Sequence, residues 1–190
     1  LRPLVEKRKF LQKEFNDIKG ISRKNKTLKQ PEPLLETEFR TNAVYGPSLL
    51  KIAKTVEHFE KRNCYSKVHD FLYSPASDKV CLIFGLRRTG KTTILKQLIL
   101  DMTKEDQAKT LYIKATSENT LAQLNADLKL ANKLEYSFVF IDEITLIDKF
   151  IDNAALLSDV YAVQGMKIVL SGTDSLGFWF AQNEELYDRA

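Results

Sequence analysis

Residues 80–93 join a short apolar run to a glycine-bounded loop, and they read Val80-Cys-Leu-Ile-Phe-Gly-Leu-Arg-Arg-Thr-Gly-Lys-Thr-Thr93. A continuous apolar run of this length is typical of a strand buried on both faces of a parallel sheet. Residues 85–92 fit the pattern G-x-x-x-x-G-K-[S/T] of a phosphate-binding loop. Because such a loop needs a strand before it and a helix after it, the helical spacing that follows supports the match. That spacing is carried by Ile94, Leu95, Leu98, Ile99 and Met102.

The residue types of this loop match the chemistry of phosphate binding. Gly85 and Gly90 let the backbone turn and let its amides approach an anion closely, and the following helix adds the positive end of its dipole. Lys91 can reach the β- and γ-phosphate oxygens, and the hydroxyl of Thr92 can bind Mg²⁺. The next residue, Thr93, is a candidate donor to an α-phosphate. The candidate nucleotide contacts are Gly85, Leu86, Arg87, Arg88, Thr89, Gly90, Lys91, Thr92 and Thr93.

A second motif is acidic and follows another apolar run. Residues 138–143 read Phe-Val-Phe-Ile-Asp-Glu, so two carboxylates stand where a buried strand ends. The carboxyl ends of parallel strands line the crevice where such sheets bind ligands. Asp142 is expected to hold Mg²⁺, through water, and Glu143 to orient and polarise the attacking water. With Lys91, Glu143 is a candidate catalytic residue, and the acidic pair favours hydrolysis of ATP over binding alone.

Two further pairs of residues have alternative interpretations. The apolar run at residues 166–170 is followed by Ser171-Gly-Thr-Asp-Ser. Ser171 or Thr173 can sense the γ-phosphate or position water, or this stretch is an ordinary turn that caps the next helix. Arg87 and Arg88 can face a phosphate or form surface salt bridges.

Strand and helix patterns alternate from residue 80 onward. This alternation predicts an α/β fold with a parallel sheet, right-handed crossovers and helices on both faces. Besides the strand before the phosphate loop, strands are expected at 110–114, 138–141 and 166–170. Helical spacing predicts helices after the phosphate loop, from about 121 to 131 and from about 147 to 157.

The chain divides into two parts by composition. Residues 1–48 are basic, partly helical and irregular over 20–48, where proline and glycine gather. Residues 49–190 are expected to form the phosphate-loop domain, starting with a helix from Leu49 to about Arg62 that Ser48 caps.

The nucleotide is expected to be ATP. A GTPase would carry Asp-x-x-Gly after the magnesium site, whereas Asp142 is followed by Glu-Ile-Thr. The guanine-binding sequence Asn-Lys-x-Asp is also missing, since Asn132-Lys-Leu-Glu135 ends in Glu. No G-x-G-x-x-G fingerprint of a dinucleotide site occurs.

The composition of the chain limits the location and the partners that can be expected for it. The two cysteines cannot form a disulfide framework, no apolar run is long enough to span a membrane, and no secretion signal precedes the domain, so a reducing, cytoplasmic location is expected. Net charge is +4, but residues 1–30 alone carry 10 Lys and Arg against 3 Asp and Glu. This basic segment is either an arm for nucleic acid or an acidic partner, or a solvated helix face.

Taken together, the three motifs at residues 85–93, 140–143 and 170–175 resemble those of bacterial and archaeal AAA-type ATP-binding proteins. The resemblance covers about residues 45–190 and implies a sheet of strand order 5-1-4-3-2 in a longer chain. It implies phosphate and magnesium roles for Lys91 and Thr92, magnesium and water roles for Asp142 and Glu143, and a sensor at Ser171 or Thr173. It also makes Arg189 a candidate for a nucleotide-sensing role.

The sequence departs from that family by stopping before the fifth strand and the helical lid. The strand of the phosphate loop would then lie at an edge unless the N-terminal segment covers it, and an exposed edge invites self-association or a protein partner. We expect a Mg²⁺-dependent ATPase that acts as a conformational switch. The alternatives are a phosphate-loop kinase of small molecules and a nucleic-acid-associated protein regulated by ATP.

Overall fold

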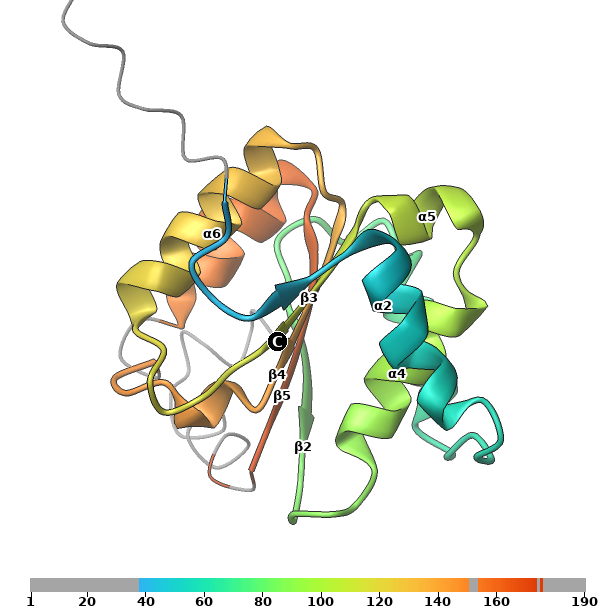
Figure 1. Ribbon diagram of the computed structural model, residues 1–190. Helices are drawn as coiled ribbons and strands as arrows, with labels where there is room; N and C mark the ends of the chain where they lie inside the picture. The colour runs from blue at the N-terminus through green and yellow to red at the C-terminus, as the bar shows by residue number, and fades with distance from the viewer. Residues whose placement is uncertain (1–37, 151–153, 174, 176–190) are drawn as a thin grey trace, which may run out of the picture. The chain divides into compact units, whose positions relative to one another are not determined.

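The computed structural model describes residues 38–150, 154–173 and 175, all of which belong to one unit, Thr37–Ala190 (Figure 1). The basic segment at residues 1–30 and the candidate Arg189 lie outside the described residues.

Five strands form one mixed sheet in the order β1-β3-β4-β5-β2. Four of them, β2 (Cys81–Phe84), β3 (Thr110–Lys114), β4 (Phe138–Asp142) and β5 (Lys167–Gly172), pair in parallel. Counted from the strand of the phosphate loop, this is the order 1-4-3-2 that the resemblance implies. The α/β fold expected from the sequence is confirmed.

The fifth strand of this sheet corrects an expectation. Residues 20–48 were expected to be irregular, yet β1 (Ala43–Val44) pairs antiparallel with β3. Asp127, which is 1% exposed, accepts hydrogen bonds from the amides of Arg40 (2.6 Å) and Thr41 (2.9 Å) and from the Thr41 hydroxyl (2.5 Å). This carboxylate fixes the chain just before β1. Since β1 lies beside β3, no strand among the described residues pairs with the outer edge of β2.

Helices cover both faces of the sheet (Figure 1). On one face, α6 (Leu121–Lys133) and the π-helix η4 (Leu157–Tyr161) pack on alternate strand residues such as Ile113 and Ile141. On the other face, α2 (Gly46–Ala53), α3 (Tyr65–Leu72) and α4 (Lys91–Asp101) pack on the intervening residues, such as Phe140 and Val169. The remaining short helices are η1 (Lys54–Val56), α5 (Lys104–Ala108), η2 (Ile144–Leu146) and η5 (Ala162–Gln164).

Two helix boundaries differ from expectation. The helix expected from Leu49 to about Arg62 runs instead from Gly46 to Ala53. Pro47 is accommodated in its first turn, where no amide donor is needed, so Ser48 lies inside the helix and does not cap it. A helix was also expected from about residue 147 to 157. Among the described residues, η2 ends just before this range and η4 begins at Leu157. Neither α3 nor α5 was expected.

None of the described helices has the length and apolar character needed to span a bilayer.

Candidate nucleotide site

The carboxylate of Asp142 joins three elements at the carboxyl end of the sheet. Asp142 is the last residue of β4 and is fully buried. Its Oδ2 accepts hydrogen bonds from the hydroxyls of Thr92 on α4 (2.8 Å) and Tyr112 on β3 (2.7 Å), and its Oδ1 accepts one from Ser171 on β5. Hydroxyls from α4, β3 and β5, which are far apart in the sequence, thus converge on the one carboxylate at the end of β4.

The phosphate loop lies between β2 and α4, and the side chain of Lys91 donates hydrogen bonds to carbonyl oxygens of the loop. Lys91 is 6% exposed, and its Nζ donates to the carbonyl oxygens of Gly85 (2.7 Å) and Leu86 (2.8 Å). The hydroxyl of Thr89 also donates to Leu86 (2.8 Å). The ammonium group is therefore held inside the loop, where phosphate oxygens can replace the carbonyl acceptors.

Helix α4 starts at this loop with a left-handed residue. Gly90 precedes it at φ 89°, and its carbonyl accepts the first helical hydrogen bond, from Ile94 (3.0 Å). Because the first turn carries no acidic residue, the positive end of the helix dipole is not offset there. Arg87 and Arg88 lie within the loop and are exposed, and neither makes an ion pair with a described residue.

Glu143 adopts a left-handed backbone conformation at φ 59°, which is uncommon for a residue with a side chain. Its amide donates to the Ser171 hydroxyl (3.1 Å), and the residue is half-buried at the start of η2. Within the described ranges its carboxylate has neither a hydrogen-bond nor an ion-pair partner. Strain of this kind gathers at functional sites, and here it follows directly after the buried Asp142.

The two candidate sensor residues differ in position. Ser171 is fully buried and contacts Asp142. Thr173 instead contacts Thr145 through its amide (3.4 Å), and its hydroxyl lies 2.8 Å from that of Ser175. The structure therefore brings Ser171, but not Thr173, to the acidic group.

Tyr112 is a member of this cluster that the sequence did not single out. It is 3% exposed, and burial, followed by the nearby charge of Asp142 and the hydrogen bond to it, raises the pKa of Tyr112 far above its usual range. The hydroxyl therefore stays a donor at all ordinary pH values. The available signal was a hydroxyl within the apolar run Leu111-Tyr-Ile, on the strand beside the acidic one.

The oxygen donors at this site suit Mg²⁺ in the presence of a phosphate chain. Mg²⁺ takes one or two carboxylates together with substrate phosphates and water, rather than a cage of protein ligands. Thr92 supplies a hydroxyl and Asp142 a carboxylate within one hydrogen bond of each other. No cluster of three or more His, Cys, Asp or Glu residues in the described part of the chain could hold a metal by itself. The donors fit a metal that arrives with its nucleotide.

Comparisons with known proteins bear on the family and on the fold. A family model described as "AAA domain" matches residues 77–190. The fold is similar to that in the complex of S. cerevisiae Hsp104 with casein, with a TM-score of 0.51 at 16% identity over 77% of this chain and 28% of that one. C. elegans PCH-2 gives a TM-score of 0.42 at 17% identity over 77% and 42% of the two chains. The chain thus spans less than half of either protein.

A search of curated proteins gives no match. The likeness to the Hsp104 structure, at 16% identity, concerns the fold alone. The family match covers more than half of the chain and includes the phosphate loop, the acidic strand and the strand that bears Ser171. The chain therefore belongs to the AAA domain family of phosphate-loop ATPases.

Proposed function

We propose that this domain binds ATP together with Mg²⁺ and hydrolyses it to ADP and phosphate. The observation that carries the proposal is the 2.8 Å hydrogen bond from Thr92 to Asp142. It joins the helix of the phosphate loop to the acidic end of β4, and these are the two places from which a phosphate-loop ATPase draws its oxygen donors.

The residues of the chain have separate roles in this proposal. Lys91 leaves the carbonyls of Gly85 and Leu86 and binds the phosphate oxygens, while the loop amides and the start of α4 neutralise further charge. Bound Mg²⁺ would add positive charge at the phosphates. Asp142 and Thr92 would hold it, and the three hydroxyls on Asp142 fix the direction of that carboxylate.

Glu143 is the proposed base that orients and polarises the attacking water. Its carboxylate is free of partners among the described residues, and its backbone is tied to Ser171. A change at the γ-phosphate would reach β5 through this contact. We therefore propose that the output of hydrolysis is conformational, a switch between nucleotide states.

Calorimetry with ATP and Mg²⁺ tests binding. The parent chain should bind and Lys91→Ala should not, whereas Lys67→Ala, which removes an exposed charge on α3, should bind as the parent does. Glu143→Gln should retain binding and lose turnover. Undiminished turnover would contradict the role of Glu143, and a phosphorylated small molecule in place of free phosphate would replace the ATPase by a kinase.

A further inference from the structure

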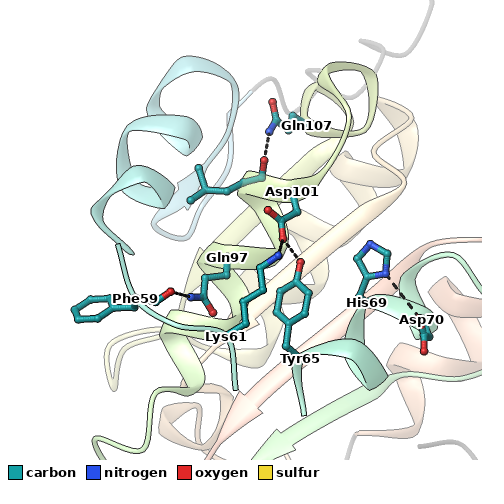
Figure 2. Close-up of polar contacts among 9 residues, drawn as sticks. Phe59, Lys61, Tyr65, His69, Asp70, Gln97, Asp101 and Gln107 are labelled. Atoms are coloured by element: carbon teal, nitrogen blue, oxygen red, sulfur yellow. Dashed lines mark hydrogen bonds and ion pairs between the residues drawn. The ribbon is translucent and has the colours of Figure 1, made fainter. Parts of the chain in front are cut away.

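The segment before α3 is held along the helix that starts at the phosphate loop. Gln97 of α4 donates from Nε2 to the carbonyl of Phe59 (2.7 Å), and Lys61 forms an ion pair with Asp101 at the end of α4 (2.5 Å) (Figure 2). Asp101 also accepts a hydrogen bond from the Tyr65 hydroxyl. Two residues of the segment, Phe59 and Lys61, are thus fixed to α4.

The next residue, Arg62, reaches the phosphate loop itself. Its guanidinium lies on Gly90, so close that a Cβ at Gly90 would be 2.8 Å from Nε and 3.3 Å from Nη2. Glycine is the residue that leaves room for this contact. Because the backbone of Arg62 accepts from the amide of Tyr65 (2.9 Å), the base of the side chain is also anchored at the start of α3.

Arg62 brings an uncompensated charge to this place. It lines a cavity of about 440 Å³ together with Phe59, Glu60, Lys61, Arg88, Gly90 and Thr93. Lys61 is engaged by Asp101, whereas the side chains of Arg62 and Arg88 make no hydrogen bond or ion pair with any described residue. The cavity therefore adjoins the phosphate loop and presents two free guanidinium groups against one carboxylate.

We propose that Arg62 is a nucleotide-contacting residue whose guanidinium binds the α-phosphate end of the ligand in the phosphate loop. The inference rests on the proposed function. Thr92 faces Asp142, so its neighbour Thr93 faces another side of the loop. Thr93 is the candidate donor to the α-phosphate, and it lines the same cavity as Arg62. A planar guanidinium suits phosphate oxygens because it donates two parallel hydrogen bonds.

The test compares ADP and ATP, each with Mg²⁺, by calorimetry on the 190-residue chain. Arg62→Gln keeps most of the side-chain stem and removes the charge, and we expect it to weaken both nucleotides equally, by about tenfold. Arg62→Lys should recover part of the affinity, because it restores the charge without the planar fork. The matched control Lys67→Gln, the same charge change on α3, should bind as the parent does.

Every other outcome contradicts the Arg62 contact, its assignment to the α-phosphate, or the proposed function. Unchanged or tighter binding by Arg62→Gln overturns the contact, and a loss confined to ATP moves the contact to the γ-phosphate and overturns the assignment. The melting temperature of the nucleotide-free chain should not change, and a fall that accompanies weaker binding would make the role of Arg62 structural. A parent chain that binds no nucleotide refutes the proposed function, and the inference with it, whereas a binding parent with an insensitive Arg62 refutes the inference alone.

Discussion

Tyr112 donates a 2.7 Å hydrogen bond to Oδ2 of Asp142, and both side chains are buried in the sheet. The parallel register pairs Lys114 with Asp142, so Tyr112 lies two residues back on the same face of the neighbouring strand. Its ring is part of the core between the sheet and α4. The orientation of the acidic group is therefore set by the core of the domain as well as by the phosphate loop.

Changes at Tyr112 and Asp142 should differ in their cost to stability. Tyr112→Phe removes one of three donors and should lower the free energy of unfolding by about 1 kcal/mol. Asp142→Ala leaves three hydroxyls without their acceptor and should cost about 3 kcal/mol or more. Urea unfolding measures both. An Asp142→Ala chain as stable as the parent would show that the hydroxyls find other acceptors.

The sequence allowed the phosphate loop and the acidic strand to be predicted, because each depends on a local pattern, whereas the strand order came from the resemblance to AAA-type proteins. It did not allow the contacts of Tyr112 or Arg62 to be predicted. Tyr112 reaches Asp142 through strand register, and Arg62 reaches Gly90 through the packing of a segment on α4, so neither contact leaves a periodic signal. The two-residue strand β1 was missed for the same reason, since the distant Asp127 fixes it.

Asp127→Ala should release β1 from the sheet. The substitution removes the acceptor of two amides and one hydroxyl just before Ala43, and we expect a loss of about 2 to 3 kcal/mol in the free energy of unfolding. Amide hydrogen exchange should rise at residues 43–44 more than at β5, on the far side of β4. Thr41→Val, which removes only the hydroxyl, should have a smaller effect, and equal exchange in parent and Asp127→Ala would contradict the role of this carboxylate.

The two cysteines should differ in reactivity. Burial raises the pKa of Cys81 to about 11, whereas Cys64 is exposed. A raised pKa lowers the thiolate fraction at every pH below it, so at pH 9 about one Cys81 in a hundred is the reactive thiolate. Alkylation of the folded chain, followed by mass spectrometry, should label Cys64 first, and the labelling of Cys81 should rise with pH up to about 11. Equal rates for both in the folded chain would be inconsistent with the burial of Cys81.

The Lys61–Asp101 pair should make part of the stability depend on pH. Burial opposes ionisation of Asp101, but the hydrogen bonds from Lys61 and Tyr65 outweigh it and lower the pKa of Asp101 below 3.8. A carboxyl whose pKa is lowered by folding stabilises the folded state above its ordinary pKa, and this contribution is lost as pH falls through the folded value. The stability gap between the parent and Asp101→Asn should be constant near neutral pH and close below about pH 4. A gap that persists at lower pH would mean that the charge of Asp101 is not its source.

Gly90→Ala should combine two costs that a second substitution can separate. The left-handed backbone at φ 89° costs an alanine about 1 kcal/mol, and the new Cβ would also meet the Arg62 guanidinium at 2.8 Å. In an Arg62→Ala background the collision is removed and the backbone strain remains, so Gly90→Ala should cost less there than in the parent. Urea unfolding of the parent, both single variants and the double variant measures this difference. If Gly90→Ala costs the same in both backgrounds, the Arg62 guanidinium is not held on Gly90 and moves aside from the new Cβ at little cost. A smaller cost in the Arg62→Ala background places the guanidinium on Gly90 without any use of nucleotide, and so checks the geometry of the proposed contact separately from its function.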